Sequence, residues 1–233
     1  MALIKSHEEI EKIAQAGRIL RKTLDILQRE TKEGVTLSAL DRLARKIIEE
    51  NGGESAFLNY RPEGAARPYP ATICASPNDI VVHGIPRAYK IKRGDVISID
   101  CGVRYQGYYA DAAFTVGITG ASPTAKKLIA VTREALEQGI KAARAGNTIG
   151  DIGAAIGSYV RKKKFRVVKG LTGHGIGTVL HEEPSVYNEG EKGKGMKLQP
   201  GMTLALEPMV AFGTSRVEQL NDDSYATADG SLS

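Results

Sequence analysis

Apolar residues recur at helical spacing near the start of the chain. Positions 10, 13, 20, 24 and 27 are all isoleucine or leucine, which places them along one side of a helix. Ser6, followed three residues later by Glu9, fits a capping box at the start of that helix. The pattern predicts a long amphipathic helix over residues 6–30.

Three more helix-start signals, each followed by apolar residues at helical spacing, occur along the chain. A Gly-x-Thr step at Gly34 starts a second helix that ends near residues 51–53, and Pro123 opens a third. Another Gly-x-Thr step at Gly146 starts a fourth helix, 112 residues after the first such step. Two helix pairs, each followed by extended segments, indicate an internal duplication whose functional site lies along the seam between the halves.

Extended segments follow each helix pair. Runs rich in β-branched and aromatic residues predict strands over 71–75, 80–82, 95–101, 108–116, 167–171 and 202–210. The glycine-rich and charged stretch 188–195 is typical of a surface loop. The order of elements predicts an α+β fold in which a curved antiparallel sheet carries helices on one face.

Two aspartates interrupt hydrophobic strands in the middle of the first half. If residues 104–107 form a four-residue hairpin loop, Val103 pairs with Tyr108 and Asp100 lies opposite Asp111. Opposed like charges destabilise a sheet, and a bound cation would remove that conflict. The alternative is a register slip that turns one aspartate to solvent.

A histidine and a glutamate in the second half favour the metal hypothesis. His174 lies between two glycines, where backbone can approach a site closely, and Glu207 interrupts an apolar strand just before a proline. Each residue alone is ordinary, as a satisfied core histidine or a solvated strand carboxylate. Together with the aspartates they indicate an oxygen-rich site for manganese, iron, cobalt or zinc, with two ions about 3.5–4 Å apart if a carboxylate is shared.

Two further histidines have the sequence context of substrate-binding groups. His83 and His181 are each followed within three residues by a proline that fixes the loop. Such positions suit donors to a substrate oxygen or a leaving nitrogen. The alternative for either one is a loop histidine hydrogen-bonded to nearby backbone.

Composition narrows the protein class. The 233 residues are 42% hydrophobic and 25% charged with two cysteines, which excludes a disordered chain and a disulfide scaffold. No apolar run approaches a membrane span, and the N-terminus lacks a signal-peptide pattern, so we expect a cytoplasmic protein without a membrane partner. The net charge of +5 includes a basic cluster at residues 161–166, read either as a cationic helix end or as a contact with RNA or the ribosome.

Six short motifs together resemble one known family. They are Val82-His-Gly-Ile-Pro86, Ile99-Asp-Cys-Gly102, Tyr109-Ala-Asp-Ala112, Gly173-His-Gly-Ile-Gly177, His181-Glu-Glu-Pro184 and Leu206-Glu-Pro-Met209. In this order and spacing they resemble the type I methionine aminopeptidases, which have the pita-bread fold. The resemblance runs from the first helix to the last residue and implies one catalytic domain over 1–233, with pseudo-symmetric halves of about 1–120 and 121–233.

The resemblance implies a metal centre that uses the four residues already singled out. Asp100, Asp111, His174 and Glu207 match the family's ligands of two divalent ions, which could be cobalt, manganese, iron or zinc. A metal-activated water would attack the carbonyl group of an N-terminal methionine, with Glu207 taking its proton. The implied substrates are nascent chains with a small second residue, cleaved by a monomer that has no DNA partner.

Further positions match the family's substrate-binding residues. His181 would help polarise the scissile carbonyl group, and His83 would contact the scissile amide nitrogen. The residues that match the lining of the methionine pocket are Phe57, Tyr60, Cys74 and Leu180.

The sequence also departs from the family pattern. In the family, a last strand bearing a Glu-His pair follows the segment seen here at 229–233, and that glutamate bridges the two ions. We therefore expect a second metal that is weakly held or absent, and an exposed sheet edge. Asp223 lies near where relatives often carry tryptophan, which makes that rim of the pocket more polar.

Two alternatives to the aminopeptidase remain at this point. One is a non-catalytic pita-bread module that binds peptide, RNA or the ribosome. The other is an enzyme that cleaves X-Pro bonds. Metal content and a comparison of Met-Ala with Ala-Pro substrates distinguish these hypotheses.

Overall fold

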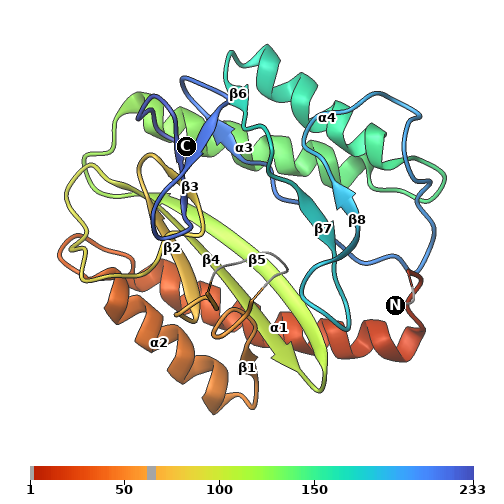
Figure 1. Ribbon diagram of the computed structural model, residues 1–233, viewed down its shortest axis with the longest axis horizontal. Coiled ribbons are helices and arrows are strands. Elements are labelled where there is room, and N and C mark those ends of the chain that lie inside the picture. The colour runs from red at the N-terminus through yellow and green to blue at the C-terminus, as the bar shows by residue number, and fades with distance from the viewer. Residues whose placement is uncertain (1–2, 62–66) are drawn as a thin grey trace.

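The computed structural model describes residues 3–61 and 67–233. Two helix pairs lie at opposite edges of the molecule in Figure 1, with the strands between them. The helices are α1 His7–Glu30, α2 Leu37–Glu50, α3 Pro123–Ala142 and α4 Ile149–Lys162. The strands are β1 Glu54–Ser55, β2 Ile73–Pro77, β3 Ile80–Val82, β4 Val96–Tyr105, β5 Tyr108–Gly117, β6 Arg166–Val167, β7 Gly173–Gly175, β8 Glu182–Val186, β9 Leu204–Ala205, β10 Val210–Ala211, β11 Val217–Gln219 and β12 Tyr225–Thr227.

The four predicted helices are confirmed, and each begins at a side-chain cap. Ser6 and Glu9 form the predicted capping box at α1, and Thr148 forms a second one at α4. The hydroxyl groups of Thr36 and Ser122 accept hydrogen bonds from the first turns of α2 and α3. These caps satisfy backbone N–H groups that have no partner within the helix, so the sequence sets where each helix starts.

The main sheet of the first half is built around β4. β5 pairs with one edge of β4 along its whole length, and β1 and β2 share the other edge. In the second half β7 lies between β8 and β9, and β6 pairs with β10. Strand β12 pairs with β3 of the first half, which joins the two halves through backbone hydrogen bonds.

Several strand boundaries differ from the prediction. The extended run predicted over 167–171 pairs only as the short β6, and the run predicted over 202–210 is split into β9 and β10. Strands β1, β7, β8, β11 and β12 are not predicted from the sequence. Each of these has five residues or fewer, which is too short for a period-two pattern to stand out.

The predicted register of the β4–β5 hairpin is wrong. The turn has two residues, Gln106 and Gly107, both with positive φ, so Tyr105 pairs with Tyr108. Such a turn matches the right-handed twist of the strands better than the expected four-residue loop. Asp111 therefore lies opposite Gly102 and not opposite Asp100.

The two aspartates nevertheless share one face of the sheet. Asp100 pairs with Ala113, which lies two residues beyond Asp111 on β5, so the aspartates are diagonal neighbours. Residues two apart on a strand point to the same side. The register slip that would turn one aspartate to solvent is thus absent.

The two halves are pseudo-symmetric in their backbone hydrogen bonds as well as in their helices. In each half, the glycine two residues before the capping threonine donates a backbone hydrogen bond to the segment that leads into the sheet. The capping threonine itself forms an isolated β-bridge with a lysine of that segment. The matching pairs are Gly34–Ile91 with Gly146–Leu198, and Thr36–Lys90 with Thr148–Lys197. Each half also has its own large hydrophobic core, beneath α1 and α2 or beneath α3 and α4.

Among the described helices, none is both long and apolar enough to cross a membrane.

The hairpin turn provides a first test of this fold. We expect Gly107→Ala to destabilise the protein by about 1 kcal/mol, because φ is +84° there and alanine is strained in that conformation. The matched control is Gly17→Ala within α1, where the space around the new methyl group is open and alanine favours the helix by about 0.5–1 kcal/mol. Urea unfolding should show opposite signs for the two variants, and equal shifts would contradict the two-residue turn.

Candidate metal centre and substrate pocket

Three of the four predicted ligands converge in space. Asp111 lies on β5, His174 on β7, and Glu207 just after β9. The Nε2 atom of His174 is 3.0 Å from Oε1 of Glu207 and 3.8 Å from Oδ2 of Asp111. One ligand atom from each residue lies within 4.8 Å of the others, which is the spacing needed to share a cation.

Asp100 lies beside this cluster rather than within it. Its carboxyl group lines the same cavity, of about 380 Å³, as Asp111 and Glu207, and it interacts electrostatically with both. The diagonal register places it one step further along the sheet. The three predicted carboxylates therefore line one cavity, and His174 joins Asp111 and Glu207 in the tight group beside it.

Glycines allow the histidine strand to fit between its neighbours. A β-carbon on Gly173 would overlap with the carbonyl oxygen of Ala205, and one on Gly175 with that of Glu183. The Nδ1 atom of His174 is 2.8 Å from the carbonyl oxygen of Gly175, an atom that can only accept. Nδ1 must then carry a proton, so Nε2 is the ring nitrogen that faces the carboxylates and is available to a cation.

The carboxyl groups are placed where ionisation is costly. Burial, followed by the charges of Asp100 and Glu207, raises the pKa of Asp111, and burial followed by the charge of Glu207 raises that of Asp100. The side chain of Asp111 is only 8% exposed, and its Oδ1 atom accepts no hydrogen bond within the described residues. A buried oxygen without a partner fits a cation ligand, so these residues suit a bound divalent metal.

The three site histidines have different electrostatic surroundings. Burial lowers the pKa of His174, but the hydrogen bond and charge of Glu207 outweigh it and the net shift is upward. Burial, with the charges of His174 and His83, lowers the pKa of His181 to about 4. Burial also lowers the pKa of His83. His181 and His83 are therefore neutral near pH 7 and can donate or accept a hydrogen bond.

The two predicted substrate histidines have different neighbours in the site. The rings of His181 and His174 are 4.4 Å apart, and Nδ1 of His181 is 2.7 Å from the hydroxyl oxygen of Tyr60. His83 lines the cavity with the carboxylates and packs edge-on against Tyr225. A substrate between the histidines would contact both.

The backbone around His83 is held in an uncommon conformation. His83 has φ of +61°, and the carbonyl oxygen of Gly84 accepts hydrogen bonds from Ala75 N and from the hydroxyl of Tyr69. A β-carbon on Gly84 would overlap with the carbonyl oxygen of Ala75. The strand and the tyrosine thus lock the histidine in its position at the cavity wall.

The four residues suggested for a methionine pocket lie together. Phe57, Cys74 and Leu180 are buried in one apolar cluster, with Tyr60 packed against it. Cys74 also lines the cavity that holds the carboxylates, so the cluster adjoins the candidate metal site. The cluster also contains four residues that the sequence analysis missed, Ala56, Tyr69, Tyr109 and Ile176. Ile176 and Tyr109 were detectable in principle, because each is two residues from a ligand on an extended segment.

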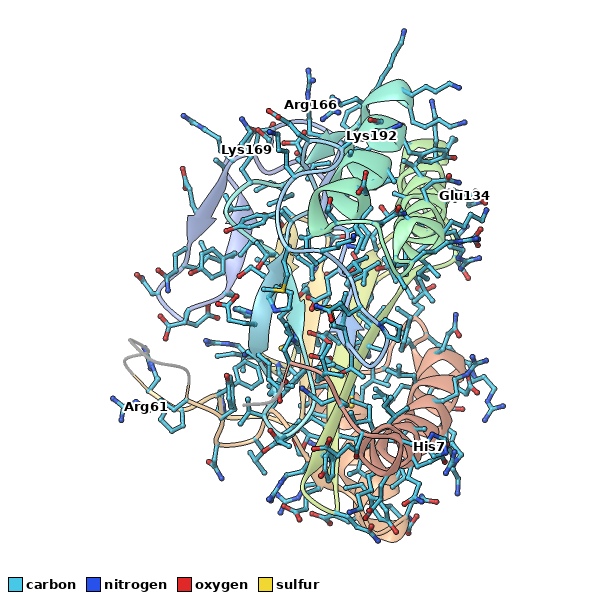
Figure 2. The ribbon with its side chains drawn as sticks, turned by 90° about the vertical axis from the view of Figure 1, so that its right-hand side faces the viewer. His7, Arg61, Glu134, Arg166, Lys169 and Lys192 are labelled. Atoms are coloured by element: carbon cyan, nitrogen blue, oxygen red, sulfur yellow. The ribbon has the colours of Figure 1, made fainter. Side chains whose placement is uncertain are left out.

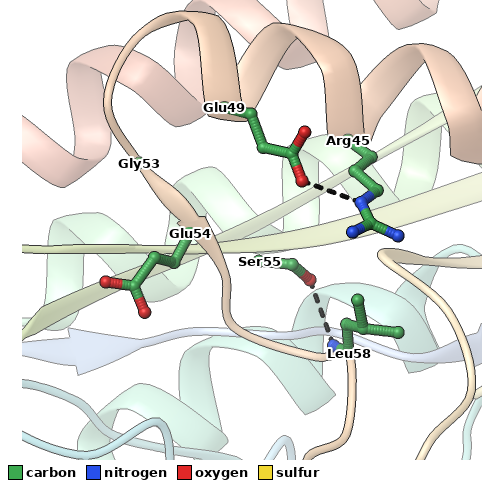
Figure 3. Close-up of a pocket in the computed structure, with 6 residues that line it drawn as sticks. All are labelled: Arg45, Glu49, Gly53, Glu54, Ser55 and Leu58. Carbon is green, nitrogen blue, oxygen red and sulfur yellow. Dashed lines mark hydrogen bonds and ion pairs between the residues drawn. The ribbon is translucent and has the colours of Figure 1, made fainter.

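A second, smaller hollow lies away from these residues. It has a volume of about 220 Å³ and lies where α2 leads into β1 (Figure 3). Its charged side chains are already paired, Arg45 with Glu49 and Glu54 with Arg104. It therefore offers no group positioned for chemistry.

The crowding of carboxylates generates a stability prediction. We expect Asp111→Asn to raise the melting temperature of the metal-free protein near pH 7 by about 2–4 °C, because about 1 kcal/mol of charge repulsion is relieved. The sign follows from a pKa raised on folding: the destabilisation is absent below the ordinary value of 3.8, grows as the pH rises from there to the folded-state pKa, and is constant above it. Manganese, cobalt or zinc should then stabilise the wild type but not the variant.

Calorimetry with and without added metal checks this expectation. The matched control is Asp41→Ala, which removes a carboxylate that accepts hydrogen bonds from Thr72 N and Ile73 N. That variant should lower the melting temperature, since two backbone groups lose their partner. A lower melting temperature for Asp111→Asn as well would show that the carboxylate is not repelled in the metal-free fold.

Comparison with known proteins agrees with this geometry. The sequence pattern of metallopeptidase family M24 matches residues 11–228. The methionine aminopeptidase of Clostridium acetobutylicum is 44% identical over 234 residues, covering 100% of this chain and 91% of the relative. Methionine aminopeptidase 1 of Bacillus subtilis is 38% identical and covers 99% and 91%.

Solved structures give the same family. The crystal structure of methionine aminopeptidase from Thermotoga maritima is similar at a TM-score of 0.94 and 38% identity, covering 100% of this chain and 92% of that one. The prolidase from Pyrococcus horikoshii has a TM-score of 0.76 at 21% identity and covers 96% and 58%, a likeness of fold alone. With a pita-bread fold, a cluster of carboxylates and histidine in its cavity, and full-length similarity to these enzymes, the chain belongs to the methionine aminopeptidases of metallopeptidase family M24.

Proposed function

We propose that this chain removes the N-terminal methionine from peptides with a small second residue. The observation that carries the proposal is the convergence of Asp111, His174 and Glu207 beside an apolar pocket. The similarity to methionine aminopeptidases over the full chain supports the same reaction. The proposal treats residues 1–233 as a single catalytic domain.

Divalent metal ions are part of the proposal, because the family is one of metallopeptidases. Asp111, His174 and Glu207 would hold one ion, and Asp100 would join Asp111 in holding a second. Bound divalent ions polarise a carbonyl group and make water acidic enough to act as a nucleophile near neutral pH. The donor set suits manganese, iron, cobalt or zinc.

The protein's own residues would orient the peptide and handle protons. The arrangement that suits a substrate carbonyl has Tyr60 donating to Nδ1 of His181, which leaves a proton on Nε2 for donation to the carbonyl oxygen. His83 would contact the scissile amide nitrogen from the other side of the cavity. The carboxylate of Glu207 would accept the proton of the attacking water.

The apolar cluster would hold the methionine side chain. Phe57 and Leu180 are 7% and 1% exposed, so a thioether chain placed against them is removed from water. The pocket has no charged lining residue among those four, which favours an apolar first residue. The hydroxyl group of Tyr60 and the imidazole of His181 mark the boundary between the pocket and the reacting bond.

The activity has a direct test. We expect the metal-loaded chain to hydrolyse Met-Ala-Ser and to leave Ala-Pro substrates intact. Glu207→Gln should lower kcat by about 10²–10⁴-fold, because the variant cannot take up the proton. The matched control is Glu134→Gln on the exposed side of α3 (Figure 2), which should retain full activity.

Metal analysis belongs to the same experiment. About two ions per chain, measured with metal in excess so that a weakly held second ion is retained, would support a two-metal mechanism. Release of proline dipeptides would favour the X-Pro reaction instead. Absence of both turnover and bound metal, combined with tight RNA binding, would favour the non-catalytic module.

We also propose that the basic end of α4 contacts ribosomal RNA. Lys162, Lys163 and Lys164 are exposed, and Arg166 and Lys169 follow them on the same end of the molecule (Figure 2). The alternative, in which the cluster only complements the helix dipole, accounts for Arg161 and Lys162 in the last turn of α4 but not for the basic residues beyond the helix. An enzyme that acts on nascent chains gains from a position near the ribosome.

Charge reversal tests this contact. We expect the triple change of Lys162, Lys163 and Lys164 to glutamate to reduce co-sedimentation with ribosomes about ten-fold at low salt, since each phosphate contact releases counterions. Turnover of Met-Ala-Ser should stay unchanged, because these lysines are remote from the cavity residues. Equal co-sedimentation of both proteins would contradict the proposal.

The proposed substrate favours a cytoplasmic location, and the composition of the proposed site is compatible with a monomer. Nascent chains carry their first methionine in the cytoplasm, and both buried cysteines are free, as expected in a reducing compartment. All residues of the proposed site come from one chain, so a monomer is sufficient.

A further inference from the structure

A buried ion pair joins Lys5, just before α1, to Glu182, the residue that follows His181. The ammonium group of Lys5 is 2.5 Å from Oε2 of Glu182, and the two side chains are 3% and 4% exposed. The lysine–carboxylate pairs on α1 and α2, such as Lys46–Glu50 at 70% and 61% exposure, lie much nearer to solvent. Glu182 follows His181 directly in sequence, so whatever fixes Glu182 also restrains the histidine.

The carboxylate of Glu182 organises the turn between β7 and β8. Its second oxygen, Oε1, accepts hydrogen bonds from Thr178 N at 2.7 Å and from Val179 N at 3.2 Å. The hydroxyl of Thr178 donates to the same atom. One carboxylate thus closes the turn on itself and pairs with Lys5 on its other side.

The lysine is held just as firmly. Its backbone N–H donates to the carbonyl oxygen of Gly201 at 2.8 Å, in the turn that leads to β9 and Glu207. A β-carbon on Gly177 would overlap with Cε of Lys5, so the lysine stem passes directly against the backbone of Gly177. Figure 1 shows this N-terminal segment reaching from the start of α1 towards the second half.

The turn closed by Glu182 positions two residues of the proposed site. Leu180 is buried in the apolar cluster, and His181 bonds to Tyr60 while packing against the ring of His174. The carbonyl oxygen of Gly177 also accepts a hydrogen bond from Tyr109 N, two residues before Asp111. The turn is therefore fastened to the metal-ligand strand at one end and to Lys5 at the other.

A contribution to stability alone does not account for this arrangement. Taking two charges out of water costs about as much as their attraction returns, and an apolar pair of similar volume is often as stable. A charged pair with further hydrogen bonds instead fixes one geometry.

We propose that Lys5 and Glu182 are positioning residues for methionine cleavage. Their ion pair sets the path of residues 178–182, which holds Leu180 against the methionine side chain and aims Nε2 of His181 at the scissile carbonyl group. This inference rests on the proposed function. It assigns to the N-terminal segment a role in the active site that the sequence motifs do not reveal.

Kinetics provide the first test. Lys5→Met and Glu182→Gln should each lower kcat/KM for Met-Ala-Ser at least ten-fold, at temperatures where circular dichroism shows the variants folded. The double variant should lose no more than either single one, because both changes break the same pair. Lys46→Met, which removes an exposed lysine from α2, is the matched control and should match the wild type.

Chemical rescue separates positioning from stability. In Lys5→Ala, propylammonium supplies the missing three carbons and the charge, and it should restore at least part of the lost turnover. Propanol, which has similar size but no charge, should not. A residue with a merely structural role would change the melting temperature without a rescue that depends on charge.

Hydrogen exchange gives a readout that needs neither metal nor turnover. In the metal-free protein, a peptide covering residues 177–182 should exchange at least ten-fold faster in Lys5→Met than in the wild type, whereas peptides from α2 should be unchanged. If Lys5→Met does not fold, Glu182→Gln serves for the same comparison.

The outcomes distinguish the two levels of the proposal. A wild type that does not cleave Met-Ala-Ser would overturn the proposed function, and the exchange result would then decide whether the pair holds the turn. Wild-type kcat/KM and exchange in folded Lys5→Met and Glu182→Gln would overturn the positioning role.

Discussion

The mutual repulsion of buried carboxylates is the constraint around which this fold is arranged. Asp100, Asp111 and Glu207 face one cavity, although their charges oppose such proximity in the absence of a cation. Their positions are fixed by strand pairing, which supplies the free energy that the charges lack. The long β4–β5 ladder holds the two aspartates, and the pairing of β7 with β9 brings His174 next to Glu207.

The pseudo-symmetry of the fold explains why the ligands meet at this place. Gly94 and Gly201 adopt the same positive φ of 91° at equivalent turns, and each is followed six residues later by an acidic ligand, Asp100 or Glu207. The two halves thus present related carboxylates to a shared seam. The proposed ion site therefore needs both halves, and the pairing of β3 with β12 is one of the contacts that join them.

Much of this arrangement could be predicted from the sequence because it rests on local signals. The helices follow from apolar periodicity and from caps such as Ser6 and Thr148. The four ligand candidates stand out because each carboxylate or imidazole interrupts an apolar or glycine-rich run. The family resemblance then linked residues that are far apart in sequence and gave them roles.

The features that could not be predicted depend on contacts between residues that are far apart in sequence, or on backbone conformations that the residue types do not indicate. The hairpin register depends on Gln106 adopting a positive φ, which glutamine seldom does. The residue types alone therefore do not indicate a two-residue turn. The short strands of the second half form through contacts with distant backbone, and period-two patterning cannot reveal them. Lys5 and Glu182 are 177 residues apart, and no spacing rule connects a lysine before a helix with a glutamate after a loop.

The division of ligands between the halves also has a consequence for synthesis. Asp111 leaves the ribosome long before Glu207, and at about 5–20 residues per second the interval is on the order of 5–20 s. During that time the first half can fold around its own core, but it holds only part of the ligand set. With the proposed ligand set, complete metal loading would wait until the second half has emerged, so a partly made chain would lack the finished site.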